Sequence, residues 1–423
     1  MISKQKIVFL TLLYILLGSV FVYFIYLKEW DSSIFKLSFN FGDVVENIIK
    51  YGKFEGKYMD GMDIPFRAHR LPGIPYFIAS LSILLGTQKV FYVALVKNLI
   101  MALLWIPILH EGINQRQVKP LFKIVLAVFV LSFPQIFLHS LQIDLEESYV
   151  IPILAYYWIL VNQQKPFNKW QKGYFLILPS LLFFSKNTFL YIVPILSVII
   201  ILSDFKKLKL VLGSLVFLAI SAYGLATFNL KNSGRFTLKY SLEWFNIYKG
   251  NNELTSKFYP KYSIDVLDYL DIYKIPESVK NEWEFNDFFK QKAQTYYKNN
   301  LDKIIEFLPT KILTIWLDVR PNSVIPGTEQ SYFTPLKLLG VFYMVVFRIM
   351  QWFCLVYLFL QLFRKNRKHF AGLSLKYISL IGLVFIPYTI AFGFERHLLP
   401  VIIPTVLTLI QIIETRNRLL VSK

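Results

Sequence analysis

The sequence predicts an all-α polytopic membrane protein with about ten transmembrane helices, additional surface or re-entrant helices, and a small, mostly helical outer domain. Its 423 residues are 55% hydrophobic and 17% aromatic. The apolar residues gather in repeated runs close to the length of about 20 residues that crosses a bilayer as a helix. Lys and Arg concentrate in short segments between these runs, where the positive-inside bias places them in membrane proteins.

The net charge of +19 does not indicate a nucleic-acid-binding protein. Most basic clusters lie in short segments between apolar runs, so membrane topology already explains them, and nucleic acid is not an expected partner. The single cysteine, Cys354, lies within an apolar run. The sequence therefore offers neither a disulfide framework nor a thiolate metal site.

The first apolar run, Ile7 to Leu27, follows the basic segment MISKQK. It is too long for the core of a signal peptide and lacks a small-residue cleavage site, so we expect a retained signal anchor. The run from Gly73 to Gly86 is too short to span comfortably, and we expect it to re-enter or to lie on the membrane surface. The further runs expected to span are 90–109, 121–141, 149–162, 173–184, 188–203, 210–229, 336–362, 374–391 and 397–413.

Charge asymmetry predicts the orientation. If the N-terminus is cytoplasmic, the basic segments between the spans all fall inside, which predicts cytoplasmic N- and C-termini in the inner (cytoplasmic) membrane of a cell. The basic segments are 116–123, 165–172, 206–209, 364–368 and 416–423. The predicted organisation is an N-terminal transmembrane module (1–229) with a first outer loop (28–72), a large outer domain (230–335) and C-terminal transmembrane helices (336–423).

The stretch GDVVENIIKYGKF, Gly42 to Phe54, predicts an amphipathic helix in the first outer loop. Asp43 and Glu46 share one face, while Val44 and Val45 share the opposite face with further apolar residues. We expect this helix to lie flat on the bilayer with its polar face turned outward.

Acidic and basic candidates gather on the predicted outer side. For each residue alone, a solvated loop end, an interfacial anchor or a lipid headgroup contact is the competing interpretation. The acidic candidates are Asp43, Glu46, and Asp144, Glu146 and Glu147 in LQIDLEESY. The basic candidates are Arg67, His69 and Arg70 in PFRAHRLPGIP, Lys186 in FFSKNTFL, Arg396 and His397 in FERHLLP, and Lys97 inside a predicted span.

Carboxylates and cations at an outer membrane edge suit the transfer of a sugar from a lipid phosphate. The phosphate leaving group needs cations to stabilise its charge. The acceptor hydroxyl must lose a proton as it attacks, and a positioned carboxylate can accept that proton. A single direct displacement would invert the anomeric configuration.

The order of motifs along nearly the whole chain resembles the GT-C class of polytopic glycosyltransferases, which includes protein O-mannosyltransferases and the lipid A aminoarabinose transferase. GDVVENIIKYGKF is similar to the class pattern D-x-x-Y-x-x-x-A ending at Gly, with Glu46 in the Tyr position. In the class, this pattern is followed by a basic residue before P-P or P-G, and HRLPGIPYF is similar to that segment. The other similar segments are SFPQIFLHSLQIDLEESY, SKNT, FNIYKGNNEL and RHLLPVIIP.

The resemblance implies a GT-C-like fold and roles for individual residues. Asp43 would be the catalytic base, and Glu146, with Asp144 as competitor, a second acidic residue that orients the acceptor or a metal. The donor phosphate would be bound by Arg70, Lys186, Arg396 and His397. The implied partners are a polyprenyl-phosphate sugar donor and a lipid or glycan acceptor, among membrane lipids. Members differ in metal use, so Mg or Mn is a possible cofactor, and no ligand spacing here decides it.

Two other classes remain open from the sequence. A polysaccharide polymerase or O-antigen ligase shares the large outer loop and the polyprenyl-linked sugar, but would rely on outer-loop Arg and His rather than on Asp43. A lipid-linked sugar transporter or flippase predicts polar residues at the bilayer midplane and an internal repeat. The sequence shows few of the former and no repeat of fixed period.

Overall fold

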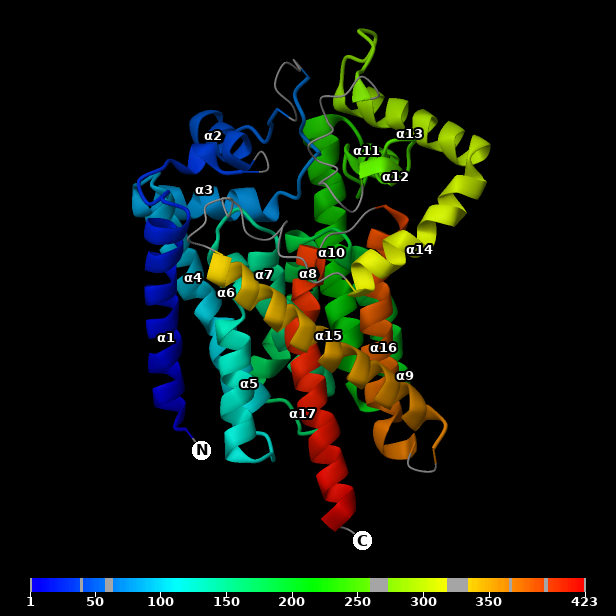
Figure 1. The fold of residues 1–423 in the computed structure, drawn as a ribbon. Helices are drawn as coiled ribbons and strands as arrows, with labels where there is room; N and C mark the ends of the chain where they lie inside the picture. Colours follow the sequence, from blue (N-terminus) through cyan, green and yellow to red (C-terminus); the bar gives the residue numbers. More distant parts are fainter. Residues whose placement is uncertain are drawn as a thin grey trace.

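The computed structural model describes residues 2–38, 41–57, 64–258, 273–317, 334–364, 367–391 and 395–421. These residues form a helical bundle with a smaller helical unit at one end (Figure 1). No strand occurs in the described ranges; the only β contacts there are the isolated bridges Ser33–Lys89 and Gly56–Phe66. The all-α prediction is confirmed for this part of the chain.

Two long outer segments, one between η1 and α4 and one between α10 and α15, interrupt the succession of bundle helices. In chain order these helices are α1 (Lys4–Val20) continued by the π-helical η1 (Phe21–Tyr26), α4 (Val90–Pro107) continued by η3 (Ile108–Asn114), α5 (Pro120–Ser132), α6 (Pro134–Leu141), α7 (Glu147–Asn162), α8 (Lys169–Ser185), α9 (Phe189–Ser203), α10 (Leu208–Ser233), α15 (Thr334–Leu362), α16 (Arg367–Ile390) and α17 (Leu399–Val421). Two 3₁₀ turns, η4 (Phe205–Lys207) and η8 (Glu395–Leu398), precede α10 and α17.

A helix occupies each apolar run that was expected to span, but the count of about ten spans is not confirmed. Within the described residues, six helices are long and apolar enough to cross a membrane, or up to seven if a bent pair counts as one span. The helices α7, α8 and α9 have only 16, 17 and 15 residues. At a rise of 1.5 Å per residue these are about 22–26 Å long, shorter than a hydrocarbon core.

The bent pair is α5 and α6, which meet at 54°. Pro134 begins α6 and has no backbone N–H to continue the ladder of α5, so the chain turns at Phe133. The bend directs the segment after α6, which carries Asp144 and Glu146, toward the N-terminal end of α7.

The first outer loop forms α2 (Phe41–Tyr51) and α3 (Gly73–Leu85). Phe41, Val44 and Val45 on the apolar face of α2 are buried as predicted, but they pack against α3 and the turn η2 (Ile34–Lys36) rather than on a bilayer. The expectation that α2 lies directly on the membrane is therefore wrong, because protein covers its apolar face. Figure 1 shows α3 lying across the end of α1 and not along it.

The large outer segment folds into helices α11 (Glu243–Lys249), α12 (Thr255–Phe258), α13 (Glu282–Asn299) and α14 (Leu301–Leu317). The side chain of Asn281 caps α13 by accepting hydrogen bonds from the backbone N–H groups of Trp283 and Glu284. A second hydrophobic core forms here around Phe245 and Phe285. Phe66 of the first outer loop belongs to this core, so the two outer segments pack together.

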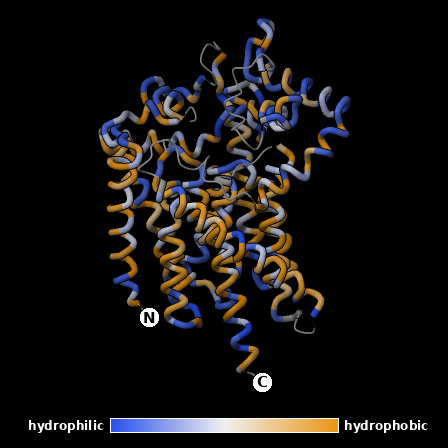
Figure 2. Tube along the Cα trace, in the orientation of Figure 1, coloured by the Kyte–Doolittle hydropathy of each residue, from blue (hydrophilic) through white to orange (hydrophobic). Residues whose placement is uncertain are grey.

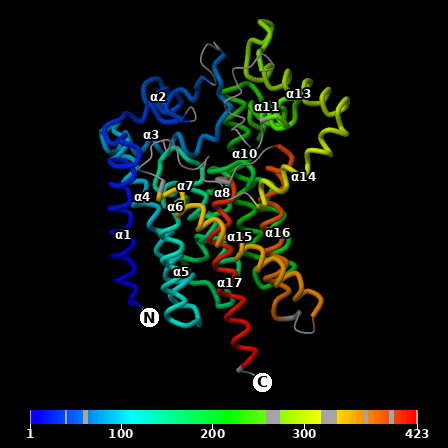
Figure 3. The backbone as a smooth tube through the Cα atoms, in the orientation of Figure 1, coloured from blue at the N-terminus to red at the C-terminus, as the bar shows by residue number. Residues whose placement is uncertain are grey.

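The two termini lie at the same end of the bundle, away from α2, α3, α11 and α13 (Figures 1 and 3). Apolar residues dominate the bundle helices, and hydrophilic residues concentrate in the outer unit and near the termini (Figure 2). The described helices therefore form a multi-pass membrane protein with a polar helical cap at one end.

Candidate active site

A cluster of charged side chains lies at the N-terminal end of α7. Lys186 Nζ lies 2.8 Å from Glu147 Oε1 and 3.6 Å from Glu146 Oε2, and Arg70 Nη1 lies 3.8 Å from Glu146 Oε1. We call Arg70, Glu146, Glu147 and Lys186 the outer charge cluster. These residues come from segments far apart in the sequence, and all four were sequence-predicted candidates.

Polar residues of α4 hold the loop that carries Glu146 through hydrogen bonds. Lys97 Nζ donates to the carbonyls of Ser140 and Gln142, both at 3.0 Å, and Asn98 Nδ2 donates to the carbonyl of Leu141 at 2.9 Å. These donors satisfy backbone carbonyls at the C-terminal end of α6 that the helix leaves unpaired. Lys97 is fully buried, so its contacts indicate a positioning role for the loop and not a contact with a donor phosphate.

Two tyrosines that the sequence analysis missed border the cluster. Lys186 Nζ lies 5.7 Å from the ring centroid of Tyr388 near the end of α16, and Tyr388 stacks on His397 at 4.3 Å between ring centroids. Tyr240 lies close enough for Glu146, Arg70 and Lys186 all to influence its ionisation. Nothing local in FIPYTI or TLKYSL distinguishes these residues from interfacial tyrosines, so only the fold reveals them.

The charges within the cluster balance one another. Burial alone would lower the pKa of Lys186, but Glu147 and Glu146 together raise it above its ordinary value, so the ammonium stays charged. Burial and the Glu146 carboxylate raise the pKa of Tyr240 well above its ordinary value. Tyr240 is therefore a neutral hydroxyl, able to donate a hydrogen bond to an anion.

Asp144 lies on the far side of the same loop, where its carboxylate accepts a hydrogen bond from the backbone N–H of Ser38 at 3.2 Å. Burial raises the pKa of this carboxyl, and the hydrogen bond from Ser38 opposes that rise. Asp144 thus joins the loop after α6 to the segment leading into α2. Glu146 fits the role of the second acidic site residue better than Asp144 does, because Arg70 and Lys186 both form ion pairs with Glu146.

Asp43 is exposed in the first turn of α2. Among the described residues its carboxylate has no ion pair. The guanidinium carbon of Arg70 lies 5.0 Å from the ring centroid of Phe41, so the start of α2 contacts the outer charge cluster. Glu46 pairs instead with Lys50 on the surface of α2, which accounts for its charge without a chemical role.

Arg67 and His69 do not join the cluster. Arg67 pairs with Glu55, at 3.1 Å from Nη2 to Oε2, and its backbone N–H donates to Glu282. His69 is buried, and burial together with the neighbouring Arg70 lowers its pKa to about 3. A histidine that stays neutral at physiological pH lacks the charge expected of a phosphate ligand.

Arg396 lies in η8, directly before His397, and its side chain is outside the described part of the structure. His397 supports Tyr388 through the ring stack, so its contact with the cluster is indirect. The FNIYKGNNEL segment proves structural: Asn251 Nδ2 donates to the carbonyl of Ile390, and Lys311 Nζ donates to Asn251 Oδ1 at 2.6 Å. A Cβ on Gly250 would lie 2.2 Å from the carbonyl oxygen of Ala391, so only glycine permits this docking.

The described residues do not fit a divalent metal site. They contain no group of three or more His, Cys, Asp or Glu side chains placed to hold an ion. Glu146 and Glu147 face Lys186, whose positive charge opposes a cation at the same place. Mg or Mn, named from the resemblance as a possible cofactor only, stays untested.

No protein-family model matches the sequence. No curated protein matches it either. Among solved structures, the chain is similar to the archaeal oligosaccharyltransferase AglB from Archaeoglobus fulgidus, solved with an inhibitory peptide and a dolichol-phosphate, at 11% identity and a TM-score of 0.42. The match covers 96% of this chain and 50% of that chain. The chain therefore spans about half the length of the matched protein, and a likeness this low assigns it neither family nor activity.

Proposed function

We propose that this protein is a GT-C-type membrane glycosyltransferase that moves a hexosyl or pentosyl group from a polyprenyl-phosphate donor to a hydroxyl acceptor on a glycolipid, cell-surface glycan or protein. The observation that carries the proposal is the outer charge cluster, in which Arg70 and Lys186 approach the two oxygens of a single carboxylate, Glu146. Two cations converging on one anionic group form the geometry that a phosphate requires.

The cluster supports binding of the donor phosphate. Lys186 has three N–H donors, of which Glu147 accepts one at 2.8 Å, so Glu147 orients the ammonium. The side chains of Arg70 and Glu146 are 24% and 26% exposed, which leaves this side of the cluster open to a ligand. Tyr240 adds a neutral hydroxyl beside the cations, and Arg396 is proposed as a further phosphate ligand, with His397 holding Tyr388 in place.

Asp43 is the proposed base. Its exposed carboxylate takes the proton from the acceptor hydroxyl, whose oxygen forms a bond to the anomeric carbon. The bond from that carbon to the phosphate oxygen breaks, its electron pair stays on the phosphate, and Arg70 and Lys186 stabilise the charge. This single displacement inverts the anomeric centre. Glu146, released from the cations by the phosphate, is placed to orient the acceptor.

The predicted orientation places this chemistry on the extracytoplasmic face of the inner (cytoplasmic) membrane, with both termini in the cytoplasm. Both termini lie at the same end of the bundle, which supports that topology, because it requires both ends of the chain to lie on one side of the membrane. A tag inserted beside the exposed Glu277 of the outer unit tests it: labelling by an impermeant reagent in intact cells is expected, and labelling only after lysis contradicts the orientation.

The main test is mass spectrometry of envelope glycolipids and glycans from a deletion strain that carries either the wild-type chain or Asp43→Asn. We expect the wild type to restore one sugar residue, and Asp43→Asn to lower its transfer by about 10²–10⁴-fold at equal protein level, because a general base contributes about that much. Asp31→Asn is the matched control, since Asp31 is an exposed carboxylate of the same loop paired with Lys89.

Restoration of the sugar by Asp43→Asn contradicts the assigned base. An envelope that is unchanged by the deletion contradicts glycosyl transfer itself. A loss of product with both Asp43→Asn and Asp31→Asn indicates that the loop needs its charge for folding, and the role of Asp43 is then rejected.

A further inference from the structure

A hollow of about 410 Å³ lies on the outer unit, and it shares no residue with the outer charge cluster. It is lined chiefly by α13, with Tyr248 of α11 on its other side. The α13 residues that line it recur at intervals of three and four, so they form one continuous face of the helix. The predicted function assigns no role to this face.

Half of this face is a row of uncharged polar groups. Gln291, Thr295 and Asn299 follow one another at four-residue intervals, and all three are exposed. Four residues of helix rise by about 6 Å, so successive groups are spaced at roughly the length of one pyranose ring. Amide and hydroxyl groups both donate and accept hydrogen bonds, which is what a row of sugar hydroxyls requires.

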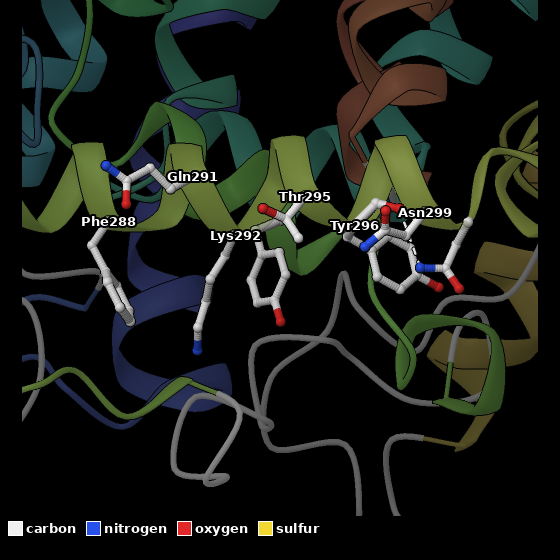
Figure 4. Close-up of a pocket in the computed structure, with 8 residues that line it drawn as sticks. Phe288, Gln291, Lys292, Thr295, Tyr296 and Asn299 are labelled. Carbon is white, nitrogen blue, oxygen red and sulfur yellow. Dashed lines mark hydrogen bonds between the residues drawn. The ribbon is translucent and has the colours of Figure 1, made fainter.

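The other half is a row of half-buried rings with an ammonium among them. Phe288, Lys292 and Tyr296 are also four residues apart, and Lys292 Nζ lies 4.8 Å from the ring centroid of Phe288 and 5.7 Å from that of Tyr248. Figure 4 shows Phe288 and Lys292 extending from the same side of α13. Aromatic rings offer flat apolar surfaces with a negative face, which suit the C–H face of a pyranose.

Hydrogen bonds connect one wall of the hollow to the helix that borders the outer charge cluster. The carbonyl of Tyr248 accepts a hydrogen bond from Asn252 Nδ2 at 2.9 Å, and the adjacent Asn251 donates to the carbonyl of Ile390 at the end of α16. Tyr388, on the last turn of α16, borders Lys186.

We infer that this hollow binds an oligosaccharide of pyranose rings, and, if the proposed function holds, that this oligosaccharide is part of the acceptor. A row of hydrogen-bonding amides beside a row of rings matches a ligand with hydroxyl edges and apolar faces. A purely apolar partner would leave the amides of Gln291 and Asn299 without hydrogen-bond partners.

The test is binding of the full-length purified chain in nanodiscs to a printed array of neutral, amino and acidic pyranose oligosaccharides. We expect retention on at least one class, reduced about tenfold or more by Gln291→Ala and by Tyr296→Ala, since each removes a direct contact. Gln294→Ala and Tyr297→Ala are matched controls. They change the same residue types on α13 outside the hollow, and they should bind as the wild type does.

Absence of retention on every oligosaccharide overturns the inference, and so does equal binding by the hollow variants and their controls. Because binding is measured without a donor, it is independent of catalysis. If the wild type binds glycans and the deletion leaves the envelope unchanged, the proposed function is rejected and the inference about the hollow stands. If Asp43→Asn loses transfer and the wild type binds no glycan, the proposed function stands and the inference about the hollow is rejected.

Discussion

The two ends of helix α7 each hold a buried lysine, and the lysines do different work. At the C-terminal end, Lys207 Nζ donates to the carbonyls of Val161 and Leu160 at 2.6 and 3.3 Å. At the N-terminal end, Lys186 Nζ contacts the carboxylates of Glu147 and Glu146. Backbone carbonyls left unpaired at a helix C-terminus attract cations, whereas a helix N-terminus carries a positive partial charge.

Lys207 is explained by the fold alone, because it satisfies carbonyls at the end where a cation is favourable. Lys186 lies at the end where a cation is unfavourable, and the two carboxylates are what keep it there. Of these two carboxylates, Glu146 is partly open to solvent and Glu147 is buried. The comparison therefore separates a lysine that the helix end explains from one that only neighbouring carboxylates explain.

The largest expected effect is on stability. In Lys186→Ala, Glu147 loses its partner while only 5% of its side chain is exposed, so we expect a loss of about 3–5 kcal/mol. Lys207→Ala removes a donor to two carbonyls and the partner of Asp204, whose side chain is 32% exposed, so we expect a smaller loss of about 1–2 kcal/mol. Thermal unfolding in detergent measures both. Equal losses of stability in the two variants would contradict the difference drawn between Lys186 and Lys207.

A second prediction concerns the loss of folding stability at low pH. The folded-state pKa of His69 is about 3, below the ordinary 6.5. As the pH falls below 6.5, the unfolded chain takes up this proton before the folded chain, so stability decreases down to about pH 3, and by about 2 kcal/mol at pH 5. His69→Gln should reduce the difference in unfolding midpoint between pH 7 and pH 5. The same difference in wild type and variant would show that His69 is not the group involved.

The smallest effect on stability is expected for Arg70→Ala. Its ion pair with Glu146 is 3.8 Å long and about a quarter exposed on both sides, so its loss should cost less than about 1 kcal/mol. Donor binding should nevertheless weaken by about 1.5–3 kcal/mol, if the guanidinium makes a charge-assisted hydrogen bond to the phosphate. Titration with a polyprenyl-phosphate sugar measures this. Full affinity together with reduced stability would place Arg70 with Lys207 as a structural cation.

Local patterns were sufficient for much of the fold. The amphipathic stretch from Gly42 to Phe54 marks a helix that the structure contains, and the outer segment predicted to be mostly helical contains α13 and α14. Gly52, directly after α2, has a φ of +66°, which glycine adopts without strain. The count of about ten spans is not confirmed by the described helices, because apolar composition does not report whether a short helix such as α7 is surrounded by lipid or by protein.

The candidate site was predicted only as a set of residue types. The sequence placed Arg70, Glu146, Glu147 and Lys186 on one predicted side of the membrane, but it also offered Arg67, His69 and Lys97 as additional candidates. The fold assigned these three to an ion pair, a buried neutral ring and helix carbonyls. Charge alone carries no information about the partner, and the partner decides the role.

The sequence by itself determined an all-helical membrane chain, because hydrophobic period and length are local properties of consecutive residues. Only the tertiary structure decided which charges meet. Arg70, Glu146 and Lys186 come from three separate connections between helices, Tyr240 comes from the segment between α10 and α11, and Tyr388 comes from α16. Such contacts depend on how helices pack, and packing is a property of the whole chain and of no single segment.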